Sequence, residues 1–217
     1  MAEPNDTPER LIAAAERLFA EGGEAATSLR AVARVAHANA AAVHYHFGGR
    51  DELLRVVFER HRAPVAERRR RLLDEAAADD PPSVARVVEA VVRPDLELLA
   101  KLRKHRVQIA RFLGRSELAA QTGGEGDETQ ARAVAMLRQA RPELSSGEIG
   151  ARLRLTRLAV AGLFAAAVGP GQPAPLGTTD PDEQVRLVVA QAATGLAGPP
   201  AGRPRGGKRR KPATAVR

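Results

Sequence analysis

The chain has 217 residues, of which 44% are hydrophobic, and these values suit one or two globular domains with a sizeable core. The absence of cysteine excludes disulfide bonds and thiolate chemistry, which fits a reducing compartment. The formal net charge of +8 comes mostly from the C-terminal end, so it does not indicate a broad basic surface on the rest of the chain.

The composition favours helices throughout. Alanine, leucine, arginine and glutamate are abundant and alternating β-branched runs are absent, so we expect an all-α fold of about nine helices. The N-terminus is polar and acidic and does not have the pattern of a secretory signal. Without a run of ~18 apolar residues, no membrane-spanning helix or membrane contact is expected. We therefore expect a cytoplasmic protein.

The first helix is predicted to begin at Thr7-Pro8-Glu9, which supplies an N-cap, a proline at the first helical position and an acid in the first turn. Leu11, Ala15 and Leu18 form its apolar stripe. The pair Gly22-Gly23 is expected to end it, because glycine is favoured after a helix.

Two short helices with a tight connection are predicted between Thr27 and Phe47. Apolar residues follow helical spacing in the first of them, and Thr27 or Ser28 can cap its start. Asn39 is a plausible N-cap for the second helix, whose inner face carries Val43 and Phe47. This arrangement is a helix-turn-helix, whose second helix can lie in the major groove of DNA.

Sequence readout would depend on the few polar groups of the second helix. Its alanines, Ala40 and Ala41 among them, offer only methyl groups, which suit the thymine methyl and close approach. Hydrogen bonding to bases therefore falls to Asn39, His44 and Tyr45. A phosphate contact for His44 and a packed ring with a hydrated hydroxyl for Tyr45 are the alternatives.

The stretch ERLIAAAERLFAEGGEAATSLRAVARVAHANAAAVHYHFGGRDELLRVVF resembles the DNA-binding domain of the TetR family of bacterial transcriptional regulators. The resemblance implies a helix-turn-helix DNA-binding domain over residues 1–50. It also implies phosphate contacts from Thr27 or Ser28, from His46 and from Arg50, where a helix start favours an anion. Arg30 and Arg34 contribute to DNA binding or lie on a solvated face. The family usually has glycine where this chain has His37, so the turn must form without it.

The fourth helix is predicted over about residues 51–77, with Pro64 inside it. The proline is expected to kink this helix, which makes it either a hinge or a simple bend around the core. The run Arg68 to Arg71 points all round the axis and is interpreted as mostly solvated. His44 and His46 do not share a helix face, so no metal site is expected, and no cofactor is expected either. No catalytic motif supports an enzyme, whereas a nonspecific DNA binder using the C-terminal tail remains an alternative.

Further helices are predicted over the rest of the chain. Ser83, Ser145 or Ser146, and Asp180 or Asp182 are the expected starts of the fifth, eighth and ninth. By resemblance, residues 51–197 form a helical effector-binding and dimerisation domain. The scarcity of aromatic residues, at 3%, and the resemblance of the chain to family members that sense fatty acyl compounds favour an aliphatic or acyl small-molecule effector. The candidate pocket residues lie on the helices that surround the cavity in this family: Leu99, Arg103, Val107, Arg111, Phe112, Leu158 and Phe164.

The last two helices are apolar over more than one face, which indicates cover on both sides. By resemblance they form a homodimer interface, a four-helix bundle of two subunits, with the interior of one chain as the alternative. The candidate interface residues are Leu155, Gly162, Leu163, Val188 and Ala192. The dimer would bind double-stranded DNA at a palindromic operator, most simply as a repressor that a small-molecule effector releases.

The last segment, residues 198–217, is predicted to be a disordered basic tail because it has too little apolar content to form a core. It adds nonspecific DNA affinity, contacts an anionic membrane surface or is merely solvated. From Ala197 onward there is no acidic residue, and the basic residues are Arg203, Arg205, Lys208, Arg209, Arg210, Lys211 and Arg217.

Overall fold

The computed structural model describes residues 7–122 and 128–198, and within these ranges it contains nine helices and no strand, which confirms the predicted all-α fold. None of the helices in these ranges combines the length and apolar character needed to cross a bilayer. The predicted tail, apart from Gly198, lies outside the described residues. The helices are α1 (Thr7–Ala26), α2 (Leu29–Val35), α3 (Ala40–Phe47), α4 (Arg50–Ala76), α5 (Val84–His105), α6 (Val107–Thr122), α7 (Glu128–Ala140), α8 (Ser146–Ala165) and α9 (Pro181–Ala197).

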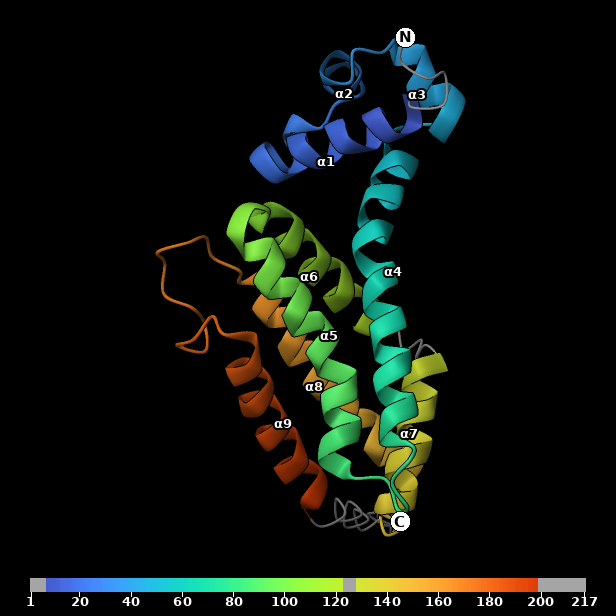
Figure 1. Cartoon of the computed structure of the whole chain (residues 1–217), viewed down its shortest axis with the longest axis vertical. Coiled ribbons are helices and arrows are strands. Elements are labelled where there is room, and N and C mark those ends of the chain that lie inside the picture. The colour runs from blue at the N-terminus through green and yellow to red at the C-terminus, as the bar shows by residue number, and fades with distance from the viewer. Residues whose placement is uncertain (1–6, 123–127, 199–217) are drawn as a thin grey trace, which may run out of the picture.

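Helices α1 to α3 form a small head at one end of an elongated molecule (Figure 1). Their inner faces meet in an apolar core, in which Leu11, Phe19, Val32 and Val43 are at most 1% exposed. These residues follow the helical periodicity of the sequence, so burial of one face of each helix holds the head together.

The end of α1 differs from the prediction. Gly23 does break the helix, with φ of 68° and ψ of −155°, a conformation that favours glycine. The helical segment then continues to Ala26, beyond the predicted end at Gly22-Gly23. This extra turn places the last carbonyl groups of α1 beside the start of α4, as described below.

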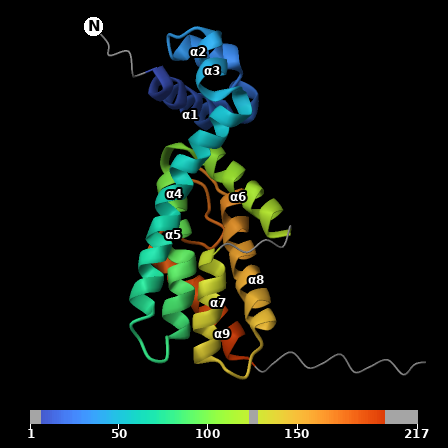
Figure 2. The same ribbon diagram turned by 90° about the vertical axis from the view of Figure 1, so that its right-hand side faces the viewer.

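Helix α4 connects the head to the remaining helices and runs along the body (Figures 1 and 2). It is continuous for 27 residues and passes through Pro64, whose ring is exposed. Its first turns are buried against the head through Leu53 and Val57, whereas Leu73 near its other end is buried in the body. Because α4 belongs to both parts, a rotation of this helix would move the head. The domain boundary at residue 50 stays a prediction.

Helices α5 to α9 pack beside the lower part of α4 and form the body (Figure 2). The closest approach is between α6 and α8. A Cβ atom at Gly114 would lie 2.3 Å from the Ala165 nitrogen and 2.7 Å from the Ala161 oxygen, so only glycine allows these backbones to meet. The predicted caps Ser145 and Asp180 each accept a hydrogen bond from the first turn of their helix, at 3.1 and 3.2 Å.

Candidate nucleic-acid interface and internal cavity

Two capped helices form the predicted helix-turn-helix. Ser28 caps α2 and accepts a hydrogen bond from the Ala31 nitrogen at 3.3 Å, and Asn39 caps α3 and accepts one from the Ala41 nitrogen at 3.0 Å. Between the helices, His37 adopts φ of 50°. Histidine reaches this region more often than most non-glycine residues, so the turn forms without the usual glycine, as predicted.

The outer face of α3 carries the candidate base-reading groups. Tyr45 is 85% exposed, the largest exposure among the large hydrophobic side chains of the described residues. His44 and Ala41 are also exposed, and Ala40 is partly exposed. The alternative of a packed Tyr45 ring is wrong, because so exposed a ring contributes little to the core. A phenolic hydroxyl in this position is free to donate to or accept from a base edge.

The two histidines of α3 have different surroundings. His44 Nδ1 lies 3.3 Å from the Gly48 oxygen, so donation from Nδ1 would leave Nε2 as an acceptor in the neutral ring. The His46 ring lies edge-on to the Tyr45 ring at 5.0 Å. No group of three or more histidine, cysteine or acidic side chains suited to a metal occurs within residues 7–122 and 128–198.

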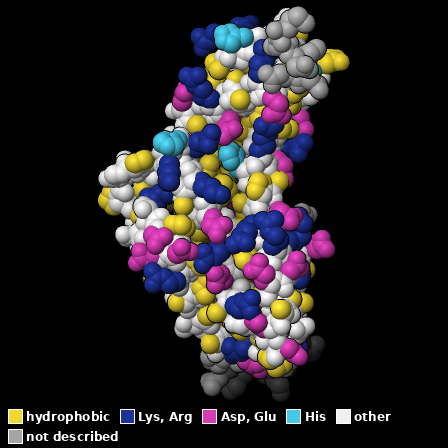
Figure 3. Space-filling view, viewed as in Figure 1, with side chains coloured by type: hydrophobic (Ala, Val, Ile, Leu, Met, Phe, Trp, Pro, Cys, Tyr) yellow, Lys and Arg dark blue, Asp and Glu magenta, His cyan; other side chains and the backbone are white. Residues whose placement is uncertain are grey.

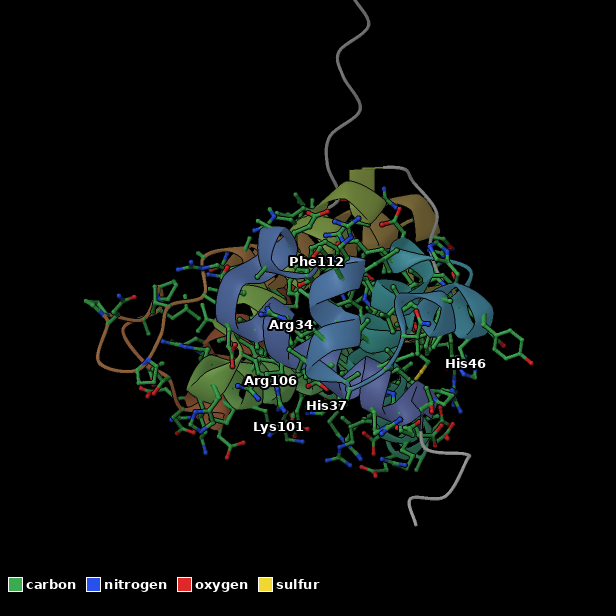
Figure 4. All side chains as sticks on the ribbon, turned by 90° about the horizontal axis from the view of Figure 1, so that it is seen from above. Arg34, His37, His46, Lys101, Arg106 and Phe112 are labelled. Atoms are coloured by element: carbon green, nitrogen blue, oxygen red, sulfur yellow. The ribbon has the colours of Figure 1, made fainter. Side chains whose placement is uncertain are left out.

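Two of the predicted phosphate contacts and both candidate arginines of α2 remain on the surface of the head. Ser28, Arg30, Arg34 and His46 are exposed. Figure 4 looks onto this end of the molecule and shows Arg34 and His37 on the same face, with His46 at its edge. Acidic and basic side chains are mixed over the face seen in Figure 3, so a few placed groups rather than a basic field would have to hold phosphates.

The prediction of a phosphate contact from Thr27 is wrong. Its side chain is fully buried, and its hydroxyl donates to the Gly23 oxygen at 2.9 Å. The threonine therefore stabilises the bend at the end of α1. Of the two candidate residues at the start of α2, only Ser28 lies where a phosphate can approach.

Arg50 has a structural role that the prediction of a phosphate contact missed. Its Nε atom donates to the backbone oxygen of Thr27 at 2.7 Å, and its Nη2 atom donates to the backbone oxygen of Glu24 at 2.8 Å. Helix α1 has no basic residue in its own last turn, so Arg50 supplies the positive charge that a helix C-terminus favours. This contact fixes the start of α4 to the head.

Replacing Arg50 with alanine is expected to lower the free energy of unfolding by about 1–3 kcal/mol, because two charge-assisted hydrogen bonds are lost. Arg55→Ala is the matched control, since its pair with Glu52 is exposed to solvent and such pairs contribute little to stability. Urea titrations of both variants measure the difference. If Arg50→Ala were as stable as the control yet bound DNA more weakly, Arg50 would be a phosphate contact instead.

The head rests on the body through an aromatic cluster and a set of ion pairs. Phe58 of α4 stacks on Phe112 of α6 at 4.1 Å, and Phe19 of α1 packs edge-on to both rings at 5.0 and 5.3 Å. Beside them, Glu16 of α1 forms an ion pair at 2.9 Å with Arg106, the residue that connects α5 to α6. A head held in this way has a defined orientation relative to the body.

His61 of α4 lies at the same junction, with Nε2 buried and 3.4 Å from the Glu16 carboxylate but without a hydrogen bond. Burial lowers the pKa of His61, Glu16 opposes this shift and Arg106 reinforces it. Below the ordinary pKa of 6.5, the unfolded chain therefore binds a proton that the folded chain excludes.

We therefore expect the part of the stability that depends on His61 to be present above pH 6.5 and to be lost as the pH falls towards the lowered value. Unfolding of the wild type, His61→Gln and the exposed-site control His105→Gln at pH 7.5, 6.5 and 5.5 measures this dependence. His61→Gln should show the weakest dependence on pH. Parallel curves for all three proteins would contradict this interpretation.

A cavity of about 230 Å³ lies between α4, α5, α6 and α8. Part of its lining is apolar and includes Leu113, Val160 and Phe164. The lining also contains charged groups of both signs. The charged lining residues are Arg62, Arg69, Asp95, Glu117 and Arg157.

Arg69 corrects the interpretation of the four-arginine run as a solvated surface. It is only 8% exposed and donates to the Asp95 carboxylate at 2.6 Å and to the Val91 oxygen at 3.2 Å. In the same lining, Arg157 pairs with Glu117 at 2.7 Å. The charges of these partly buried pairs are compensated, because each guanidinium faces a carboxylate. The other arginines of the run are at least partly exposed, as predicted.

Of the seven predicted pocket residues, only Phe164 lines this cavity. Leu99 is 2% exposed and belongs to the core, while Val107 and Leu158 are partly buried. Arg103 and Arg111 donate to the backbone oxygens of Val168 and Ala167, at 3.3 and 2.8 Å. They stabilise the chain beyond α8, so the predicted pocket residues other than Phe164 do not match the lining of this cavity.

Phe112 instead lines a second, more open cavity of about 340 Å³ at the junction of head and body. Glu24 and Asp51 contribute to its wall from the head side, and Ser116 contributes from α6. Arg62 lines both cavities and therefore lies between them.

An apolar stripe on α8 is exposed to solvent. Leu155 is 66% exposed, and Ala159 and Ala166 are also exposed on the same face. A Cβ atom at Gly162, between them, would have no neighbour within 4 Å. On the adjacent α9, Leu187 is 48% exposed.

The other predicted interface residues are less exposed and so less available to a second subunit. Leu163 and Val188 are partly buried against the core of their own chain. Ala192 is 9% exposed and belongs to that core, which does not fit the predicted interface. Leu187 was not among the predicted residues.

The family model for bacterial regulatory proteins of the tetR family matches residues 11–57, from α1 into α4. A TetR-like transcriptional regulator from Rhodococcus sp. RHA1 has a similar structure with a TM-score of 0.60 at 20% identity, over 90% of this chain and 99% of that chain. A TetR-family regulator from Streptomyces coelicolor A3 gives a TM-score of 0.51 at 19% identity, over 91% of this chain and 99% of that chain. No curated protein matches the sequence. The predicted resemblance is thereby confirmed: the family model covers the helix-turn-helix, and the solved structures share the fold.

Proposed function

We propose that this TetR-like transcriptional regulator acts as a homodimeric repressor, which binds a palindromic operator in the cytoplasm and is released by a small molecule. The observation that carries this proposal is the capped helix-turn-helix whose second helix exposes Tyr45 and His44. Such a helix fits the major groove, where these side chains reach base edges. The proposed repressor acts by binding DNA, and this function requires no catalytic group or cofactor.

Phosphate contacts would fix the position of α3 on the duplex. Ser28, at the exposed start of α2, can donate to a phosphate oxygen. Arg30, Arg34 and His46 are exposed on the same head, and Figure 4 shows Arg34 and His46 from above. Asn39 is exposed, but its side-chain oxygen caps α3, so only its amide nitrogen remains to donate. Tyr45 and His44 therefore carry most of the proposed base readout.

The exposed apolar stripe of α8, together with Leu187 of α9, supports the proposed dimer. Leu155, Ala159 and Gly162 follow the spacing of one helix face, and the small residues Ala159 and Gly162 would let a second helix approach closely. Two copies packed through α8 and α9 would form a four-helix bundle. A dimer of this kind would place its two recognition helices ~34 Å apart, in successive major grooves.

The cavity supports the proposed release by an effector. Its wall includes α4, and the same helix is attached to the head through Arg50 and the aromatic cluster. A ligand that favours a different position of α4 would therefore favour a different head spacing. The operator-binding state would lose population according to the difference in the ligand's affinity for the two states.

Selection from random duplexes at fixed salt tests this proposal. We expect an enriched inverted repeat with half-site centres ~10 base pairs, or one helical turn, apart. The chain without residues 198–217 should select the same repeat, since the basic tail adds only nonspecific affinity. Enrichment of no motif would instead favour a nonspecific DNA binder, and an unpaired half-site would contradict the dimer.

A further inference from the structure

We propose that the cavity between α4, α5, α6 and α8 takes a small ligand with one anionic group and an apolar body, and that Arg62 is the counter-ion of that group. This inference rests on the proposed function, since it names the chemical class of the effector. It goes beyond an aliphatic ligand by specifying a charge and the residue that binds it.

The charges of the cavity are unequal. Three guanidinium groups and two carboxylates line it, and both carboxylates are engaged by arginines, Asp95 by Arg69 at 2.6 Å and Glu117 by Arg157 at 2.7 Å. Burial raises the pKa of Asp95, against the opposing effect of Arg69, and protonation of this group would make the cavity more positive still. A cationic ligand would therefore have to displace an arginine from its carboxylate.

Arg62 is the remaining cation of the lining. It is exposed and makes no ion pair or hydrogen bond with any other described residue. A guanidinium offers five N–H donors in a planar arrangement that matches a carboxylate or phosphate. An anionic ligand would consequently gain a charged partner here without breaking an existing pair.

The apolar lining residues would contact the rest of the ligand. Leu98, Leu113, Val160 and Ala161 offer aliphatic surface, and Phe164 is the only aromatic residue of the lining. The volume of about 230 Å³ is below the ~300–1,000 Å³ of sites for drug-sized ligands. A short aliphatic chain fits these walls better than a flat ring system.

The position of Arg62 also suggests how binding of such a ligand would affect the head. Arg62 is shared with the second cavity, whose wall includes Glu24 and Asp51 from the head side. An anion in the first cavity would attract the guanidinium of Arg62 towards that cavity and so out of the second. Ligand binding would thereby change the charge next to the start of α4.

Calorimetric titration with matched probes tests the proposal. The full chain is titrated at pH 7.5 with linear carboxylates from butanoate to decanoate, and with the alcohol and the amine of each chain length. We expect at least one carboxylate to bind about tenfold or more tightly than its alcohol and amine. Arg62→Gln should weaken carboxylate binding about tenfold and leave alcohol binding unchanged.

Arg55→Gln is the control, because Arg55 lies on the same helix and lines only the second cavity. Failure of every carboxylate to bind, tighter binding of the amine, or equal effects of Arg62→Gln and Arg55→Gln would overturn the inference. The selected operator duplex is then added to the same samples. A carboxylate that binds through Arg62 but leaves operator affinity unchanged would retain the ligand class and refute only the proposed release.

Discussion

Replacing His44 and Tyr45 together with alanine is expected to abolish specific operator binding while leaving the fold and the dimer intact. Both side chains are exposed on α3, Tyr45 by 85%, so their removal opens no cavity in the core. A good contact to a base edge contributes ~1–3 kcal/mol of discrimination. Loss of two such contacts should lower operator affinity about a hundredfold or more and leave nonspecific affinity unchanged.

The matched control is His105→Ala, which removes an exposed histidine from the body, at the end of α5. Fluorescence anisotropy with the selected operator and a scrambled duplex measures both affinities, and unfolding curves check the fold. An operator affinity equal to that of the control would move base readout elsewhere, to Asn39 and the arginines of α2.

The second large effect is expected at the dimer interface. Leu155→Glu combined with Leu187→Glu should convert the dimer to a monomer, because two carboxylates per subunit would be buried without partners. Since both leucines are exposed in the single chain, the monomer itself should keep its stability. The monomer should also lose cooperative binding to a palindromic operator, because it engages one half-site only.

Leu176→Glu is the matched control, since this leucine is also exposed, by 36%, but lies in the loop before α9. Sedimentation velocity at micromolar concentration gives the oligomeric state of both proteins. A wild type that is already monomeric, or a dimer that survives the double substitution, would refute the α8–α9 interface.

Local sequence rules were sufficient to predict the helix-turn-helix. The caps Ser28 and Asn39 are recognised by residue type and position, and the apolar spacing places Val32 and Val43 in the core. Even the departure at His37 was interpreted correctly, because the conformational preference of a single residue decides it. Patterns within one helix or one turn were thus reliable for α2, α3 and the turn between them.

Contacts between distant segments could not be predicted in this way. Arg50 lies 26 residues from Glu24 in the chain, and nothing in the local pattern distinguishes a helix-capping arginine from a phosphate contact. Likewise, Arg69 is one of four consecutive arginines, and only the packing of α4 on α5 places it beside Asp95.

The residues of the cavity and of the exposed α8–α9 surface could not be predicted for a related reason. The predicted pocket residues lie on appropriate helices, but a small rotation about the helix axis decides which side chain faces the cavity. Arg103 and Arg111 donate hydrogen bonds to backbone oxygens beyond α8, whereas Arg62, which lines the cavity, was not among the predicted pocket residues. On α9, the exposed leucine is Leu187 and the predicted Ala192 is buried.

The most direct test of the proposed regulator is a binding titration of the full chain, at fixed salt, against its own upstream promoter DNA and a scrambled duplex of equal length. A preference of ~10³-fold or more for the upstream DNA is the predicted result. The regulator of a distant gene would show this preference only for the operator obtained by selection, which is therefore titrated in parallel. Equal affinity for all three duplexes would contradict sequence-specific regulation and leave a nonspecific binder.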